Sequence, residues 1–362
     1  MKVQGKQGIH SVVVFCLLAF VLFIVVFSLK DAFINYADTE NTGKAETELF
    51  AMDTYITVTV YGEDTGKAET ALSQAVDMFM RLERLWSVTD RDSDIYALNH
   101  SSGRPVVMSD ETVQLISFAL QMAEETGGSL EPTLYPVLTA WGFTTETNRV
   151  PSAAEISTLL EAVDYTQVRL EGNSVCLADG MMLDLGAVGK GYAGDLVSQV
   201  LKENGIESAL LDIGGNIQTV GTKPDGSTWR LGLRNPFDGG TLGILEVSNL
   251  AVVTSGNYER YFVGEDGKRY GHIIDPATGC PVENGLASVT VISEEGRLCD
   301  ALSTSLFVMG LENASDYWRQ NKNFEMILIT VDGEIYLTDG AAEIFTLDSH
   351  QEDRKVNVIQ NE

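Results

Sequence analysis

The sequence has few of the residues that build disulfide frameworks or zinc clusters. Its 362 residues include only four cysteines and four histidines. Cys16 lies in an N-terminal apolar run, and the other three cysteines cannot all pair with one another. No CxxC spacing occurs, so nothing indicates a disulfide scaffold or a zinc ribbon. We therefore expect unpaired cysteines that are mostly buried.

Positive charge is also scarce. The chain has 24 lysines and arginines against 52 aspartates and glutamates, which gives a formal net charge of −28. Nucleic acids and anionic lipid surfaces repel such a protein, so we expect no nucleic-acid partner. A phosphorylated ligand would have to be held by local groups, namely backbone amides, a lysine or a metal ion.

One long apolar run is present, and it lies at the N-terminus. Residues 12–29 are 18 apolar or small residues in succession, just long enough to span hydrocarbon as a helix. Lys2 and Lys6 precede the run, which favours a cytoplasmic N-terminus. We expect residues 1–30 to form a single-pass anchor in the cell membrane, with the rest of the chain extracytoplasmic. A cleaved signal segment is the alternative.

The remainder of the chain predicts one globular domain. Residues 31–48 have the composition of a polar tether, residues 49–348 that of a folded domain, and residues 349–362 that of a frayed polar tail. In residues 52–61, apolar side chains alternate and predict a strand. Helices are predicted over residues 69–86 and 192–204, from Asp110 to the glycines at 127–128, and from the capping box that begins at Ser152.

The C-terminal half reads mainly as strands and turns. A short helix is expected near residues 299–310, and a hairpin is expected around Asp332-Gly333. Because helices and strands do not alternate regularly, the predicted fold class is α+β, with mixed β-sheets flanked by helices.

A glycine loop is the first candidate site. Residues 184–195 read DLGAVGKGYAGD, in which three glycines spell G-x-G-x-x-G. A strand-like segment precedes the loop and a helix follows it, as in dinucleotide-binding folds, where the helix N-terminus favours a phosphate. Asp212 stands where a ribose partner would lie, so a Rossmann oxidoreductase is one reading. The other is a helix packed closely on a strand.

Three further stretches carry polar groups that suit catalysis or ligand binding. His272 and Asp275 flank two isoleucines near a strand end, a plausible place for an acid–base group. Asp300 and Thr304 are four residues apart, so a helix places both oxygens on one face, as Mg²⁺ ligation would require. Alternatively they are an N-cap and a hydroxyl bonded to its own turn. Residues 255–257, Ser-Gly-Asn, form a turn that could grip a ligand.

Taken together and in order, these stretches resemble the ApbE family, the FAD:protein FMN transferases. The likeness runs from about Phe50 to Phe345. Eight segments carry it: AMDTYITVTVYG (51–62), DSDIYALN (92–99), EPTLYPVLTAWGF (131–143), DLGAVGKGYAGD (184–195), LLDIGGNIQTVG (210–221), TSGNYERYF (254–262), HIIDPATGCPV (272–282) and DALSTSLFVMG (300–310). Where the family often has tyrosine, near the second segment, this chain has Thr89.

The resemblance implies an Mg²⁺-dependent enzyme. Such enzymes cleave the pyrophosphate of FAD, attach FMN through its phosphate to a threonine or serine hydroxyl of a target protein, and release AMP. The resemblance assigns catalytic roles to His272, as the base, and to Asp300. It assigns metal-ligand positions to Ala187 through its backbone oxygen, Asp300, Ser303 and Thr304, and flavin-nucleotide positions to Met52, Glu131, Pro132, Thr133, Asp184, Lys190, Asn257 and Ile274.

The resemblance also implies an acceptor protein with a Ser/Thr flavinylation motif, such as a subunit of an ion-pumping redox complex or an exported flavoprotein. Residues 49–348 would then be the catalytic domain. Two other functions stay open on sequence alone. One is an FAD pyrophosphatase that yields FMN and AMP, and the other is a flavin-binding protein without catalytic activity.

Overall fold

The computed structural model describes residues 43–145 and 147–360 of the chain. The expected membrane anchor at residues 1–30 lies outside these residues. Within residues 43–145 and 147–360, no helix is both long enough and apolar enough to cross a bilayer.

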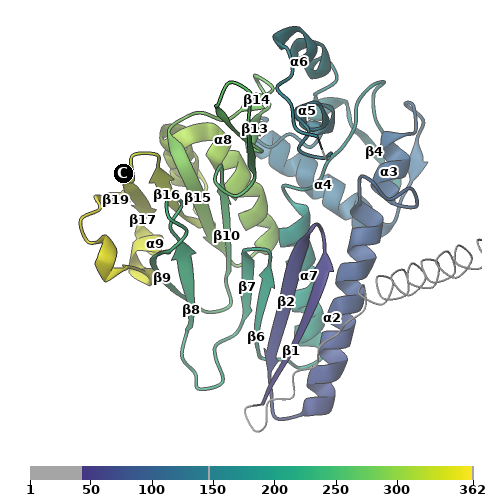
Figure 1. The fold of residues 1–362 in the computed structure, drawn as a ribbon. Helices are drawn as coiled ribbons and strands as arrows, with labels where there is room; N and C mark the ends of the chain where they lie inside the picture. Colours follow the sequence, from purple (N-terminus) through teal and green to yellow (C-terminus); the bar gives the residue numbers. More distant parts are fainter. Residues whose placement is uncertain (1–42, 146, 361–362) are drawn as a thin grey trace, which may run out of the picture.

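A nine-stranded sheet forms the centre of the fold (Figure 1). Its neighbouring strands are antiparallel, except for the last pair, which is parallel. The strands in spatial order are β1 (Lys44–Ala51), β2 (Thr54–Tyr61), β6 (Ser208–Ile213), β7 (Asn216–Val220), β10 (Ala251–Gly256), β15 (Leu286–Ser293), β16 (Glu325–Thr330), β17 (Ile335–Thr338) and β19 (Val356–Ile359).

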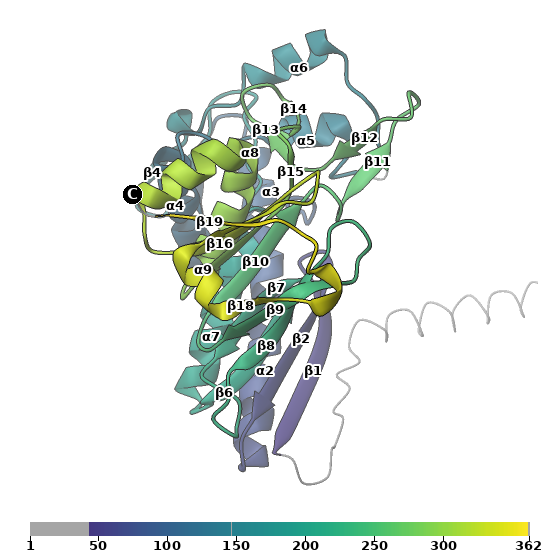
Figure 2. The same ribbon diagram turned by 90° about the vertical axis from the view of Figure 1, so that its left-hand side faces the viewer.

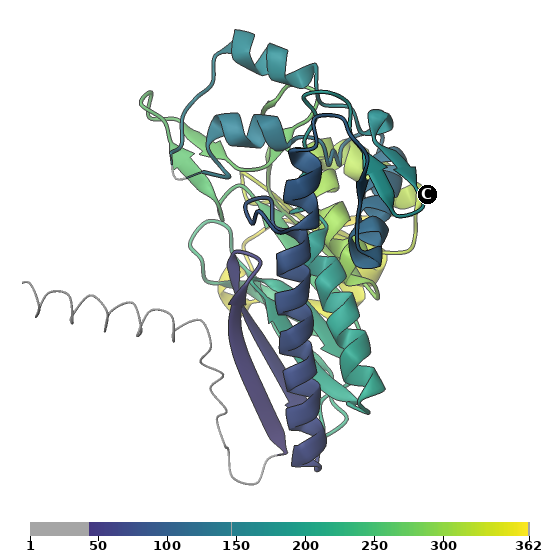
Figure 3. The same ribbon diagram turned by 90° about the vertical axis from the view of Figure 1, so that its right-hand side faces the viewer.

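Three long helices cover one face of this sheet. They are α2 (Thr65–Trp86), α7 (Gly189–Glu203) and α8 (Gly296–Gln320), and α7 packs between the other two. Figure 3 shows α2 and α7 side by side on this face. The alternating side chains of β2, Ile56, Val58 and Val60, are fully buried here, because period-two spacing points them to the same side of the strand.

A small sheet covers part of the opposite face (Figure 2). Its strands are β8 (Trp229–Arg234), β9 (Thr241–Val247) and β18 (Phe345–Leu347), and they bury a second apolar cluster against β16 and β17. The other elements are α3 (Asp94–Asn99), β3 (Val106–Val107), α4 (Asp110–Glu125), α5 (Tyr135–Trp141), α6 (Ala153–Leu160), η2 (Tyr165–Gln167), β4 (Arg169–Glu171), β5 (Ser174–Cys176), β11 (Tyr261–Val263), β12 (Arg269–Gly271), β13 (Ile274–Asp275), β14 (Cys280–Pro281), α9 (Asp339–Ile344) and η3 (Ser349–Gln351).

The predicted α+β class with mixed sheets is confirmed, and so are most helices. Ser152 caps α6 by accepting a hydrogen bond from the Glu155 backbone N–H at 3.2 Å. The hairpin around Gly333 is also present, with Gly333 at a left-handed φ of 90°. The cysteines in the described residues are free, but of the three only Cys299 is buried.

Several predicted boundaries are wrong. Residues 44–48, expected in the tether, belong to β1, which pairs with β2 along its whole length. In the tail, residues 356–359 form β19 and join the main sheet beside β17. The short helix expected near residue 299 is the first part of the 25-residue α8, which breaks at Gly310 (φ 79°). Each of these segments gains its partner only in the folded chain, so local pattern alone does not reveal it.

Candidate active site

The candidate site begins where the first turns of α7 and α8 cross. A side chain at Gly191 would place its Cβ 2.2 Å from the Gly296 backbone oxygen and 2.7 Å from Asp300 Cβ. Glycine is therefore required here for contact between the two helices. Gly194 in turn lies against Gln218 and Ile213 of the sheet, so the alternative of a helix packed closely on a strand describes the motif better than a phosphate-binding fingerprint does.

The Rossmann alternative is wrong on topology. The segment before the loop forms only an isolated bridge between Met182 and Leu134, and α7 begins already at Gly189. The strand after the helix, β6, pairs antiparallel with both β2 and β7. Asp212 accepts a hydrogen bond from the Gly215 backbone N–H at 2.9 Å and thereby closes the turn between β6 and β7.

Asp300 lies at the helix crossing and is only 4% exposed. Its Oδ2 accepts a hydrogen bond from the Gly191 backbone N–H at 2.8 Å, and its Oδ1 accepts one from Asn216 Nδ2 at 3.0 Å. The Gly191 amide, in the first turn of α7, is thus committed to Asp300. Each carboxylate oxygen still has a further lone pair for another partner.

Three hydroxyl groups on α8 and β10 lie close to one another, near the backbone of Asp300. Ser255 Oγ lies 2.9 Å from Ser303 Oγ and 3.3 Å from Thr304 Oγ1, while Ser303 Oγ donates to the Asp300 backbone oxygen at 3.0 Å. The structure therefore brings together three predicted site residues, Asp300, Ser303 and Thr304. Thr304 pairs with Ser255 on the neighbouring strand rather than with its own turn.

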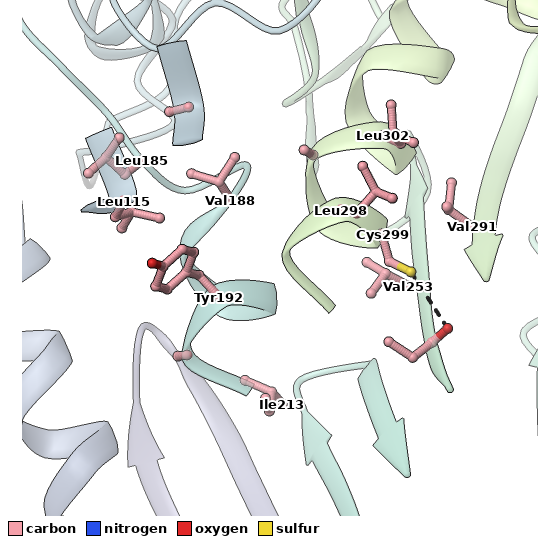
Figure 4. Close-up of a cluster of buried hydrophobic side chains, with 14 of the residues drawn as sticks. Leu115, Leu185, Val188, Tyr192, Ile213, Val253, Val291, Leu298, Cys299 and Leu302 are labelled. Atoms are coloured by element: carbon pink, nitrogen blue, oxygen red, sulfur yellow. Dashed lines mark hydrogen bonds between the residues drawn. The ribbon is translucent and has the colours of Figure 1, made fainter. Parts of the chain in front are cut away.

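The loop before α7 is anchored by apolar side chains. Leu185 and Val188 are buried in the same cluster as Leu298, Cys299 and Leu302 of α8 (Figure 4). The Cys299 thiol donates to the Ala251 backbone oxygen at 3.6 Å, which ties α8 to β10. Because these side chains fix both ends of the turn at residues 186–188, the backbone oxygen of Ala187 is held in a defined position.

Asp184 and Lys190 stand on either side of that turn. Asp184 Oδ1 accepts a hydrogen bond from the Gly186 backbone N–H at 2.8 Å, and Lys190 Nζ donates to the Gly186 oxygen at 3.4 Å. Burial raises the pKa of the Asp184 carboxyl, and the Gly186 amide and the positive charges of Lys190 and Arg260 oppose that rise. Lys190 and Arg260 thus form a local positive region in a strongly acidic protein.

His272 faces the same two cations. Its Nδ1 lies 3.1 Å from the Arg260 backbone oxygen, which can only accept, so Nδ1 carries the proton and Nε2 keeps a free lone pair. Burial and, after it, the charges of Arg260 and Lys190 lower the pKa of His272 to about 4, while the hydrogen bond to the Arg260 oxygen opposes them. Asp275, by contrast, accepts from Ala277 N and Thr278 Oγ1 in its own turn.

The segment at residues 131–133 is held by its own polar groups. Glu131 accepts hydrogen bonds from Thr133 at 2.6 and 2.9 Å and from the Tyr165 N–H at 3.2 Å, and burial raises the pKa of its carboxyl. Thr133 Oγ1 in turn accepts from the Asp164 N–H, and the Pro132 oxygen accepts from the Asp184 N–H at 2.8 Å. Glu131 and Thr133 therefore fix the backbone segment that lies next to Asp184.

The other predicted flavin positions differ in environment. Met52 has a left-handed φ of 54° in the β1–β2 turn, whose Asp53 pairs with Arg260 at 3.5 Å. Asn257 donates to the Val282 oxygen at 2.9 Å, and within the described residues its buried Oδ1 has no hydrogen-bond partner. Ile274 is 4% exposed and packs in an apolar cluster with Trp141.

Sequence reasoning did not single out Asn216, Arg260 or Asp195. Asn216 and Asp195 stand inside segments that carry the family resemblance, but no spacing rule marks them as contacts of Asp300 and α8. Asp195 Oδ1 and Oδ2 accept hydrogen bonds from the backbone N–H groups of Gly296 and Arg297 at 2.7 and 3.0 Å.

Comparison with known proteins gives a consistent result. The sequence model of the ApbE family matches residues 52–328. The FAD:protein FMN transferase of Klebsiella pneumoniae (strain 342) is 35% identical over 293 residues, which cover 79% of this chain and 89% of the relative. The FAD:protein FMN transferase of Treponema pallidum (strain Nichols) is 33% identical and covers 79% and 84%.

Solved structures of relatives share the fold. The crystal structure of the ApbE protein from Thermotoga maritima superposes with a TM-score of 0.79 at 31% identity, over 83% of this chain and 99% of that protein. The flavin transferase ApbE from Vibrio cholerae superposes with a TM-score of 0.76 at 27% identity, over 84% and 100%. The chain therefore belongs to the ApbE family.

Proposed function

We propose that this chain transfers FMN from FAD to a serine or threonine hydroxyl of a target protein and releases AMP. Relatives that share its fold and sequence are named FAD:protein FMN transferases. The observation that carries the proposal is the cluster at the helix crossing, where the Asp300 carboxylate and the Ser255, Ser303 and Thr304 hydroxyls lie beside the loop of Lys190.

We propose further that the reaction requires Mg²⁺. The donor set suits this ion, which prefers hard oxygen ligands and keeps several waters. The ligands would be the Asp300 carboxylate, the Thr304 hydroxyl and the backbone oxygens of Ala187 and Ser303. Within the described residues no group of three His, Cys, Asp or Glu side chains could hold a metal, so hydroxyl and carbonyl oxygens must contribute. When bound, the ion would neutralise charge that develops on the phosphates of FAD.

The protein's own groups would position the two reactants. Lys190 and Arg260 offer positive charge to the pyrophosphate, and the 131–133 segment and Asp184 shape the neighbouring wall. The oxygen of the acceptor hydroxyl forms a new bond to the phosphorus of the FMN moiety, and the bond from that phosphorus to the bridging oxygen breaks and releases AMP. His272 Nε2 takes the proton of the hydroxyl, since its lowered pKa keeps the ring neutral at pH 7.

We also propose where the reaction takes place. The apolar run at residues 12–29 would anchor the chain in the cell membrane and leave the catalytic domain outside the cytoplasm. The acceptors would then be membrane or exported subunits with a Ser/Thr flavinylation motif. Fractionation of cells that express the full chain or a chain starting at residue 43 tests this, because only the full chain should sediment with membranes. Equal sedimentation of both would refute the anchor.

Incubation of an acceptor with FAD, Mg²⁺ and the full chain tests the transferase proposal. The expected result is a fluorescent acceptor band in a denaturing gel and release of one AMP per flavin attached. Accumulation of free FMN and AMP without a fluorescent band would favour an FAD pyrophosphatase. Bound FAD that stays intact after Mg²⁺ is added would favour a flavin-binding protein without catalytic activity.

A further inference from the structure

The N-termini of α7 and α8 are capped by each other's aspartates. α8 begins after Glu295, whose side chain makes no capping hydrogen bond, and its first two backbone N–H groups donate instead to Asp195 of α7. α7 begins after Val188, which also provides no side-chain cap, and the Gly191 N–H donates to Asp300 of α8. The first turn of a helix leaves such N–H groups unpaired, so each aspartate satisfies donors that its own helix does not.

This reciprocal arrangement links Asp195 to the position of Asp300. Asp300 lies four residues after Gly296, about one helical turn from the N–H groups that Asp195 holds. Gln218 reinforces the crossing, since its Nε2 donates to the Gly191 backbone oxygen at 3.0 Å and its Oε1 accepts from Ser198 Oγ at 3.2 Å. Any movement of the first turn of α8 along α7 would therefore move the Asp300 carboxylate.

We propose that Asp195 is a positioning residue that holds the first turn of α8 so that Asp300 lies correctly for metal and phosphate binding. The inference rests on the proposed function, in which Asp195 is not among the residues that bind either reactant. A bidentate carboxylate suits this task because its two oxygens fix two adjacent N–H groups at once. Asparagine has a single acceptor oxygen, and its amide N–H₂ would face the second N–H donor.

Stability provides a way to separate positioning from simple capping. Burial raises the pKa of Asp195 to about 6, against the opposing effect of its two hydrogen bonds. An acid whose pKa is higher in the folded protein than in the unfolded chain contributes stability when protonated and loses it as pH rises through 6. At pH 7.5 the ionised side chain is thus less favourable to folding than a neutral acid. In Asp195→Asn the removal of this charge offsets the N–H donor that asparagine leaves unpaired, so we expect a Tm close to that of the wild type.

The charged groups around Asp195 come from both helices. Arg297 and Glu295 face it from the start of α8, and the buried thiol of Cys299 lies on the same helix. Lys202 and Glu294 line a cavity of about 290 Å³ on this side of the crossing, which Asp195 also lines. None of these groups was singled out for the metal or flavin site.

The test compares Asp195→Asn with wild type and with Asp64→Asn in the full chain. Asp64 also caps a long helix, accepting from the Lys67 N–H at 3.1 Å at the start of α2. The 22 residues of α2 place it roughly 33 Å from Trp86, which packs near Gly189. We expect Asp195→Asn to lower kcat/KM for FAD and raise the Mg²⁺ concentration for half-maximal transfer, each by about 10–100-fold. Asp64→Asn should change neither.

Two further readouts separate this inference from its alternatives. The amide hydrogen of Gly191 should exchange faster in Asp195→Asn than in the wild type, although the two proteins have equal Tm values. This result is expected whether or not the wild type transfers FMN. Failure of the transferase proposal alone would leave this exchange result intact. As the pH is lowered from 7 to 5, the transfer rate of the wild type should fall because Asp195 becomes protonated. The rate of Asp195→Asn should not show this fall.

The inference would be overturned if Asp195→Asn had the same kcat/KM, the same Mg²⁺ requirement and the same rate of Gly191 amide exchange as the wild type. A loss of activity that merely parallels a fall in Tm would equally refute it, since a structural cap would behave that way. If Asp195→Asn does not fold, Asp195→Ser, which retains one acceptor, is measured in its place against the same outcomes.

Discussion

At the scale of single residues, His272 is the group that we propose as the base. Its Nδ1 is committed to the Arg260 oxygen, so only Nε2 can accept a proton. We expect His272→Ala to reduce the rate of transfer by about 10²–10⁴-fold with little change in FAD affinity. Single-turnover transfer and equilibrium FAD titration measure the two quantities.

His100 provides a matched control for this substitution. Its Nδ1 also lies within hydrogen-bond distance of a backbone oxygen, that of Tyr96 at 2.8 Å, but its ring stacks on Tyr96 and it is not among the candidate site residues. His100→Ala should transfer FMN at the wild-type rate. Since the pKa of His272 is about 4, its protonation should reduce activity only near that pH. Unchanged turnover in His272→Ala would remove this residue from the role of base.

Asp300 should prove both catalytic and structural. Its carboxylate is buried, since Asp300 is 4% exposed and accepts hydrogen bonds from Gly191 and Asn216. Asp300→Ala should abolish transfer and also lower the free energy of unfolding by about 1–3 kcal/mol for each donor left unpaired. Urea denaturation and the gel assay measure these effects. The control is Asp316→Ala, on the exposed part of α8, which should change neither transfer nor the free energy of unfolding. Transfer at the full rate by Asp300→Ala would refute the metal assignment.

At the scale of secondary-structure elements, the crossing of α7 and α8 sets the geometry of the site. Gly191→Ala would drive a methyl group to 2.2 Å from the Gly296 oxygen, so the helices must separate. We expect a loss of about 1–3 kcal/mol in unfolding free energy and a marked loss of transfer activity. Thermal unfolding and the transfer assay measure both.

Gly189→Ala is the control within the same motif. A Cβ at this position would lie 3.9 Å from the nearest atom, on the Trp86 ring, which is ordinary contact. We expect near wild-type stability and activity. If the glycines instead served to admit a phosphate to the backbone, Gly189→Ala would be the more damaging of the two substitutions.

The pattern of elements shows which features local sequence can reveal. The α2 and α4 helices and the β2 strand follow from periodicity and caps, because each buries one regular face. β1 and β19 do not, because the mostly polar β1 and the four-residue β19 become strands only through pairing with β2 and β17. The contact of Gly191 with Gly296, 105 positions along the chain, likewise depends on tertiary packing, which no local pattern encodes.

For the site, family resemblance pointed to Asp300, Ser303 and Thr304, which lie together on α8, and their roles as ligands stay a prediction. It did not reveal how they are held. The roles of Asn216 and Asp195 arise from hydrogen bonds between elements far apart in sequence, and sequence spacing gives no measure of such distances. The residue types in the sequence thus predict which side chains could bind a metal ion. Where those side chains lie depends on how the helices pack.

At the scale of the whole molecule, net charge opposes substrate binding. The formal charge of −28 repels the two negative charges of the FAD pyrophosphate, and Lys190 and Arg260 counter it locally. Raising the ionic strength from about 10 mM to about 150 mM shortens the screening length from roughly 30 Å to 8 Å. Distant repulsion then weakens more than the short-range attraction, so the association rate of FAD should rise with salt at constant Mg²⁺. Stopped-flow flavin fluorescence measures this rate, and uncharged riboflavin should show no such change. An association rate for FAD that falls steeply with salt would mean that local cations outweigh the global field, contrary to the view that a divalent ion is needed to bring the phosphates in.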